Sequence, residues 1–196
     1  MRTYKRHSNR GFTLVELMIV IAIIGILAAL AIYGVTRFIG SSKSAEARQT
    51  VGAISRAAQA AYERQTAPSE ALAPGTLSLT GAQAICGSAA PVPAAIPAGK
   101  KYQPNPAEGA DFETGDATGG WKCLRFRMSD PITYQYSYTK GSSPISNQVN
   151  SPDSFEAGAQ GDVDADAVIS QFALTGQIQS GGLTRSTQVF VVNESE

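Results

Sequence analysis

The feature that most constrains this chain is a run of apolar residues close to its N-terminus. The run covers residues 12–35, 24 positions in all, and Glu16 is its only charged residue. As an α-helix it would be about 36 Å long, enough to cross the roughly 30 Å hydrocarbon core of a bilayer. Four basic residues lie in the ten positions before Gly11. The pattern predicts a membrane-inserted helix with a basic cytoplasmic end.

Two other interpretations of this run each leave one feature unexplained, either its length or the charge of Glu16. A secretory signal peptide usually has a shorter apolar core, of about 7–15 residues, although residues 29–31 (ALA) imitate its cleavage site. A plain single-pass anchor fits the length and the flanking charges but gives Glu16 no role. Glu16 can interact with the positive end of the helix dipole. That interaction does not by itself justify a carboxylate within an apolar run, where such groups are usually paired or functional.

The residues around Glu16 resemble the signal sequence of type IV pilins and type II secretion pseudopilins. The sequence GFTLVE, residues 11–16, follows a short basic leader and opens the apolar run. The resemblance implies that a prepilin peptidase cuts between Gly11 and Phe12, removes residues 1–11 and methylates the new N-terminus. It also implies that Glu16 pairs with the Phe12 amine of a neighbouring subunit when the helices bundle, since a buried carboxylate needs a cation.

The same resemblance implies which partners the chain has and where in the cell it lies. The partners are further copies of the chain or related subunits in a helical polymer, the prepilin peptidase and an assembly machinery in the inner membrane. The subunit would be held as a single-pass protein in the inner membrane and then enter an extracellular pilus or a periplasmic pseudopilus. Many major pilins have a proline where Tyr33 stands here, after Ala31-Ile32. Its absence leaves open whether the chain is a major pilin, a minor pilin or a pseudopilin.

A helical pattern continues beyond the apolar run. No proline occurs between residues 37 and 65, and apolar side chains recur at spacings of 4, 3, 4 and 3. This spacing predicts one stripe on a helix, and the stripe consists of Ala47, Val51, Ile54, Ala58 and Ala61. We therefore expect one helix over about residues 12–65, with residues 36–66 as an amphipathic continuation. Its stripe needs a globular partner to cover it.

The region of residues 67–120 is rich in Ala, Pro and Gly and shows no strong periodicity, which predicts a long loop. The two cysteines of the chain are Cys86, in this loop, and Cys123, just after it. An even number of cysteines in an exported chain indicates one disulfide and an oxidising compartment. Two separate free thiols are the alternative.

Residues 121–196 alternate in the manner of an antiparallel sheet. Strands are predicted over 123–128, 133–139, 155–159 and 168–174, with an edge strand at 188–192. Tyr134, Tyr136 and Tyr138 lie on one side of the second strand, where core packing is favoured over an aromatic ligand-binding face. The expected fold class is α+β: a long N-terminal helix, transmembrane in its first half, packed on an antiparallel β-sheet head. The pilin resemblance implies the same arrangement.

A further candidate site is the acidic sequence GDVDAD. Asp162, Asp164 and Asp166 offer oxygen ligands at the spacing of a calcium loop. Ala167 replaces the turn glycine of an EF-hand and Ala173 its bidentate glutamate, so an EF-hand is excluded. A different calcium site and a solvated acidic turn both remain open. No other cofactor is expected.

Composition argues against an enzyme and against a nucleic-acid-binding protein. The only histidine is His7, in the segment predicted to be removed. Without the leader, 12 basic residues face 16 acidic ones, a net charge of −4. Arg125 and Arg127 therefore make only a weak basic patch. The rival functions are a type II secretion pseudopilin and a membrane-anchored module whose head binds a ligand.

Overall fold

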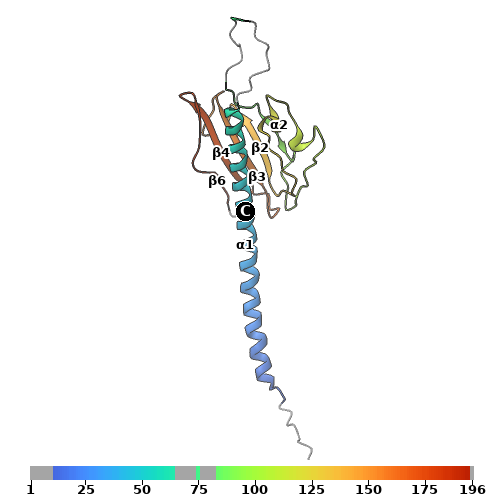
Figure 1. Ribbon diagram of the computed structural model, residues 1–196. Coiled ribbons are helices and arrows are strands. Elements are labelled where there is room, and N and C mark those ends of the chain that lie inside the picture. Colours follow the sequence, from blue (N-terminus) through green and yellow to red (C-terminus); the bar gives the residue numbers. More distant parts are fainter. Residues whose placement is uncertain (1–10, 65–73, 76–82, 195–196) are drawn as a thin grey trace, which may run out of the picture. The chain divides into compact units, whose positions relative to one another are not determined.

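The computed structural model describes residues 11–64, 74–75 and 83–194 (Figure 1). The chain divides into two units, Met1–Ile39 and Gly40–Glu196, which we describe separately. One long helix, α1 (Leu14–Glu63), includes residues of both units. The helix predicted over residues 12–65 is present, and Gln65 lies outside the described residues. Most of the predicted leader, residues 1–10, also lies outside them.

In the first unit, the described residues of α1 leave their apolar side chains exposed. Leu14, Ile24 and Leu30 are 59–76% exposed, and none of residues 14–39 is buried. The helix is long and apolar enough here to cross a membrane. A helix that is apolar on all sides has to be buried in lipid or among other helices.

The second unit contains a six-stranded sheet in which every pair of neighbouring strands is antiparallel. The strands are β1 (Ala89–Val92), β2 (Gln135–Lys140), β3 (Ser154–Gly161), β4 (Ser170–Gln179), β5 (Gly182–Arg185) and β6 (Phe190–Val192). They are ordered β1-β2-β3-β4-β5, and β6 pairs with the first part of β4. The predicted strands at 133–139, 155–159, 168–174 and 188–192 correspond to β2, β3, β4 and β6 with shifted bounds.

The part of α1 in the second unit provides the other layer of the core. The five predicted stripe residues, Ala47 to Ala61, are all buried, four of them at 1% exposure or less. They belong to one apolar cluster with Tyr136 and Tyr138 of β2 and Phe172 of β4. Small residues on the helix leave room for these large rings on the sheet. The α+β fold class predicted from the sequence is confirmed.

The tyrosines before and within β2 pack in the core, as predicted. Tyr134, Tyr136 and Tyr138 are fully buried. The ring of Tyr134 lies 5.7 Å from that of Phe172, and the ring of Tyr138 lies 5.5 Å from that of Phe155, measured between centroids. These contacts leave no aromatic surface for a ligand at this row.

Contacts between α1 and the sheet define two ends of this unit. At one end, Ser44 donates a hydrogen bond to the backbone oxygen of Glu194, and the Arg48 guanidinium lies 5.9 Å from the centre of the Phe172 ring. At the other end, the Tyr62 hydroxyl donates to the backbone oxygen of Gly181 after β4. We call these the Ser44 end and the Tyr62 end.

The prediction of a strand over residues 123–128 is wrong. A short helix, α2 (Gly120–Leu124), occupies its first part, and Arg125 ends that helix in a left-handed conformation (φ 56°). The apolar alternation has another cause: Trp121 and Phe126 pack with Phe112, with ring centroids 4.9–5.6 Å apart. Phe112 lies in a 3₁₀ helix, η1 (Asp111–Glu113).

Three further details differ from the sequence analysis. Strand β1 lies in the region predicted as a loop, where Trp121 donates a hydrogen bond from Nε1 to the Ala90 oxygen at 2.9 Å. Strand β4 continues to Gln179 and forms a hairpin with the unpredicted β5. Val168, expected on the buried side of β4, precedes the strand and is 37% exposed. The turn at Ser180-Gly181 requires positive φ at both residues, which glycine adopts readily and serine does not.

Candidate functional site

The predicted processing site lies immediately before α1. Gly11 and Phe12 are both exposed and precede the first helical residue, Leu14. Phe12 is 81% exposed. Both sides of the peptide bond between them are therefore accessible, which is what cleavage by a peptidase requires. Cleavage itself remains a prediction.

Glu16 takes part in a capping box at the start of α1. The Thr13 backbone nitrogen and hydroxyl both donate to Oε2 of Glu16, at 3.0 and 2.8 Å, and the Glu16 nitrogen donates to the Thr13 hydroxyl at 3.3 Å. This reciprocal pairing satisfies backbone donors that have no partner within the helix. The sequence analysis missed Thr13, although its signal, Thr followed three residues later by Glu, is present.

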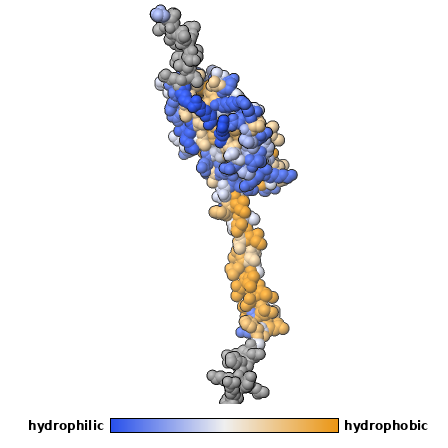
Figure 2. All heavy atoms as spheres, turned by 45° about the vertical axis from the view of Figure 1, so that its right-hand side comes forward, coloured by the Kyte–Doolittle hydropathy of each residue, from blue (hydrophilic) through white to orange (hydrophobic). Residues whose placement is uncertain are grey.

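The capping box leaves half of the Glu16 carboxylate available. Both bonds to the side chain use Oε2, and Oε1 accepts no hydrogen bond from the described residues. Glu16 is exposed, and the face of this stretch of α1 that Figure 2 shows is predominantly hydrophobic. The carboxylate can therefore accept a bond from another molecule without giving up its local role.

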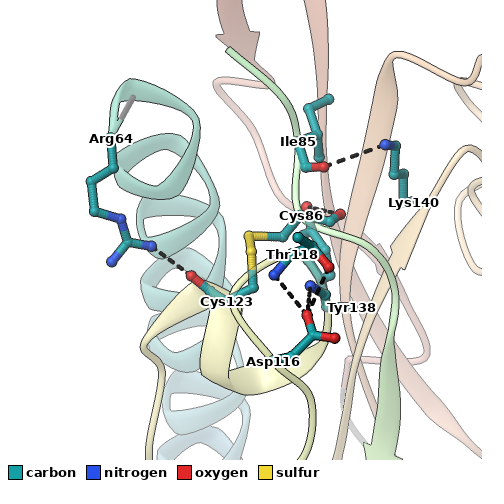
Figure 3. Close-up of a disulfide and its surroundings, with 9 residues drawn as sticks. Arg64, Ile85, Cys86, Asp116, Thr118, Cys123, Tyr138 and Lys140 are labelled. Atoms are coloured by element: carbon teal, nitrogen blue, oxygen red, sulfur yellow. Dashed lines mark hydrogen bonds between the residues drawn. A yellow bond between two sulfur atoms is a disulfide. The ribbon is translucent and has the colours of Figure 1, made fainter. Parts of the chain in front are cut away.

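A disulfide joins Cys86 and Cys123, as the sequence predicts, with their Cα atoms 5.9 Å apart (Figure 3). It ties the segment before β1 to α2. Beside it, Arg64 donates a hydrogen bond to the Cys123 backbone oxygen at 2.6 Å. The disulfide thus holds α2 next to the Tyr62 end of α1.

A cavity of about 900 Å³ lies around this disulfide. Its lining includes three cationic side chains, Arg64, Lys122 and Arg125, and one carboxylate, Asp116. We call this cavity the disulfide pocket. Burial lowers the pKa of Arg64, and the nearby charge of Arg125 lowers it further. The two arginines are therefore close enough to repel each other, and an anion between them would relieve that repulsion.

Asp116 does not neutralise these arginines through an ion pair. Its Oδ1 accepts bonds from the Thr118 hydroxyl and nitrogen, both at 2.7 Å, and from the Gly119 nitrogen at 3.0 Å. These bonds, led by that of the Thr118 hydroxyl, lower the pKa of Asp116. Among the described residues, the only ion pair in the lining joins Lys122 Nζ to Glu108 at 3.3 Å.

The three aspartates of GDVDAD are brought together between β3 and β4. One oxygen from each of Asp162, Asp164 and Asp166 lies within 4.8 Å of the others. Asp162 is 8% exposed, and its two oxygens accept bonds from the Ala165 and Ala167 nitrogens at 2.7 and 3.2 Å. Asp166 accepts from the Val168 nitrogen at 2.7 Å. These bonds hold the turn in place, and calcium binding by the three carboxylates stays a prediction.

Comparison with known proteins places the similarity in the N-terminal segment. Residues 6–32 match the family model described as a prokaryotic N-terminal methylation motif. The chain is 59% identical over 46 residues to the type IV major pilin protein PilA of Myxococcus xanthus, a match that covers 24% of this chain and 21% of that protein.

Two further relatives match the same kind of short segment. The type IV major fimbrial protein FimA of Dichelobacter nodosus is 62% identical over 38 residues, 19% of this chain and 24% of the relative. The fimbrial protein EcpC of Eikenella corrodens is 52% identical over 44 residues, 22% of this chain and 29% of the relative. The matches thus span between a fifth and a third of each relative's length. No solved structure matches the chain significantly.

These findings define the class of protein. The methylation motif, the identities to type IV pilins and fimbrial proteins, and an apolar helix that continues into a helix-on-sheet unit support the type IV pilin family. The relatives are named as pilin and fimbrial proteins, and the N-terminal part of α1 is long and apolar enough to cross a membrane.

Proposed function

We propose that this chain is a prepilin that becomes a structural subunit of a type IV pilus or a related filament with a role in motility or adhesion. A prepilin peptidase cuts between Gly11 and Phe12 and methylates Phe12. The apolar helix holds the subunit in the inner membrane, and an assembly machinery transfers it to the filament. The observation that carries the proposal is an apolar helix with its side chains exposed on all sides and one carboxylate near its start.

Helix packing supplies the cohesion of this filament. The apolar side chains of residues 14–35 are exposed in the described part of their own unit, and lipid can cover them only while the subunit stays in the membrane. Bundling with the helices of other subunits covers the same surface outside the membrane. Burial of apolar area contributes about 25 cal/mol per Å² when that area would otherwise meet water.

Glu16 sets the register of the bundle in this proposal. In a dry bundle its charge needs a cation, and the methylated Phe12 amine of a neighbouring subunit supplies one. The capping box supports this role because Thr13 fixes Oε2 and leaves Oε1 open. A displaced neighbour would leave two unpaired charges in an apolar environment, which costs several kcal/mol.

Two variants separate the roles of Glu16. Glu16→Gln removes the charge but keeps a side chain that can form the capping box. Thr13→Ala removes the capping hydroxyl, at a cost of about 1 kcal/mol, but keeps the charge. We expect Glu16→Gln to reduce the amount of protein in the sheared cell-surface fraction strongly, and Thr13→Ala to assemble nearly as the native chain does. Equal assembly of the native and Glu16→Gln chains would contradict the pairing.

Intact mass of the protein in each fraction tests the processing step. We expect the mass of residues 12–196 plus one methyl group in surface fibres. The same mass found only in the membrane fraction would identify a pseudopilin instead. A full-length mass, or a cut after Ala31, would overturn the proposal and favour an anchored ligand-binding module or a secreted domain. No cofactor is required for the proposed role.

A further inference from the structure

The two ends of the second unit carry exposed charges of opposite sign. The disulfide pocket, with Arg64, Lys122 and Arg125, lies at the Tyr62 end. The connection between β3 and β4, with Asp164 and Asp166, lies at the Ser44 end. The latter follows from a chain of contacts: Ser170 donates to the Gly161 oxygen at 3.0 Å, Gly161 packs on the Tyr134 ring, and that ring contacts Phe172 beside Arg48.

At the Tyr62 end, two guanidinium groups have no carboxylate partner among the described residues. The ion pairs among the described residues of the whole unit join Arg48, Lys122 and Arg127 to glutamates, and Arg64 and Arg125 are in none of them. Arg125 is exposed and is held out from α2 by its left-handed backbone. The pocket therefore presents unpaired guanidinium groups beside the disulfide.

At the Ser44 end, Asp164 and Asp166 lie in the exposed turn between β3 and β4. Both are exposed, while Asp162 turns inward and holds the turn through backbone nitrogens. Lys100 and Lys101 directly follow Gly99, whose backbone nitrogen donates to the Asp162 backbone oxygen at 2.8 Å. Neither lysine comes within 4.0 Å of an aspartate oxygen in the described structure. The two carboxylates thus remain available to another molecule.

These two surfaces cannot meet within one subunit. The stretch of α1 from Ser44 to Glu63 rises about 28 Å, at about 1.5 Å per residue. A polymer that grows by a repeated rotation and translation instead needs two different complementary surfaces on each subunit. An exposed acidic turn at one end and a basic pocket at the other satisfy that requirement.

We propose that the disulfide pocket of one subunit receives the Asp164–Asp166 turn of a second copy of the chain in the filament. This inference rests on the proposed function, because it places the contact in a polymer. Arg64 and Arg125 bind the incoming carboxylates, and Lys122 lies within reach of them. The disulfide keeps α2, and with it Lys122 and Arg125, in the position that the turn enters.

Zero-length crosslinking of sheared native fibres tests this contact. A carbodiimide joins a lysine amine to a carboxylate that touches it, and peptide mass spectrometry then identifies the pair. We expect a link between Lys122 and Asp164 or Asp166 in fibres and its absence in full-length subunits dispersed in detergent. The Lys122–Glu108 link is the internal positive control, since these groups are 3.3 Å apart in one subunit. Lys122→Arg is the matched control: it keeps the charge and removes the crosslinkable amine.

Charge exchange provides a second test. Arg125→Asp suits the left-handed position, which aspartate tolerates, and Asp164→Arg reverses the partner. We expect each single variant to lower fibre yield about five-fold, the factor for one ion pair of about 1 kcal/mol. The double variant is expected to recover most of that loss.

The outcomes separate the inference from the proposed function. Fibres that show the Lys122–Glu108 link but no link from Lys122 to Asp164 or Asp166 would overturn the inference and leave the pilus role intact. Native fibre yields in both single variants would do the same. A native chain that forms no fibres at all would overturn the proposed function, and the contact with it.

Discussion

Glu156 provides a specific test of the interactions that stabilise the second unit. It lies on the face of β3 that points away from α1, since it alternates with Phe155 and Ala157 of the core. Its side chain is nevertheless only 1% exposed. The connection between β2 and β3 covers it: Oε1 accepts from the Ile145 nitrogen at 2.8 Å, and Oε2 accepts from the Ser146 nitrogen at 2.9 Å.

The cost of changing Glu156 follows from these bonds. The Ser146 hydroxyl also donates to Oε2, so the carboxylate accepts three hydrogen bonds, each worth about 1.5–3 kcal/mol for a charged acceptor. Glu156→Gln keeps the shape but turns an amide group toward one of the donors. We expect a loss of about 2–3 kcal/mol for this variant. Glu156→Ala leaves all three donors without the acceptor, and we expect about 3–5 kcal/mol.

Thermal unfolding of the full-length protein in detergent measures this loss. For a unit of this size, a loss of about 2–3 kcal/mol lowers Tm by roughly 4–12 °C. Gln160→Ala is the matched control, because Gln160 lies on the same face of β3 and its side chain makes no hydrogen bond to described residues; its effect should stay within about 0.5 kcal/mol. Hydrogen exchange at the Ser146 amide reports on the connection itself. An unchanged Tm together with unchanged protection at Ser146 in Glu156→Gln would refute the reasoning.

Three further predictions concern the core and the disulfide. Tyr136→Phe should leave stability unchanged or raise it by up to about 1 kcal/mol in chemical denaturation, because the buried hydroxyl has no partner among the described residues. Cys86→Ser with Cys123→Ser should lower the free energy of unfolding by up to about 4 kcal/mol, since the bridge closes a loop with a separation of 37 residues; an equal midpoint in the reduced and oxidised native protein would contradict this. Burial raises the pKa of Tyr134, Tyr136 and Tyr138 above the usual value near 10. Their contribution to stability should therefore be constant below about pH 10 and be lost at higher pH, when the unfolded chain loses these protons first. Absorbance of tyrosinate should then show three tyrosines that titrate only with unfolding, and early titration of all of them would refute it.

The long helix was predictable from the sequence because its signals are local and repeated. The apolar run requires a nonpolar environment, and the spacing from Ala47 to Ala61 fits only a helix with one buried stripe. The alternating strands β2, β3 and β4 were found for the same reason. Each of these patterns indicates which face of its own element is buried, so the element can be predicted without knowledge of distant residues.

The errors lie where distant contacts decide the local structure. Leu124, Phe126 and Met128 alternate as in a strand, but the ring packing of Phe112 with Trp121 and Phe126 makes the segment a short helix and a turn. Strand β1 was missed because its sequence, AAPV, has no alternation and pairs with β2 at an edge. For the candidate sites, the sequence predicted the position of Glu16 near the helix start, the Cys86–Cys123 disulfide and the grouping of the three aspartates. It could not predict that Arg64 and Arg125 line the same pocket.

The distribution of similarity to known pilins is understandable in terms of what each part of the chain has to contact. Identities of 52–62% are confined to 38–46 residues, and the family model matches residues 6–32, which contain most of the apolar run. In the proposed filament this segment meets the peptidase, the membrane and other helices, and each position has several constraints at once. The second unit has to keep only its own core and complementary surfaces at its two ends. A pairing such as Arg125 with Asp164 can therefore be replaced by any other complementary pair, which is why it has to be found in this chain's own structure rather than by comparison.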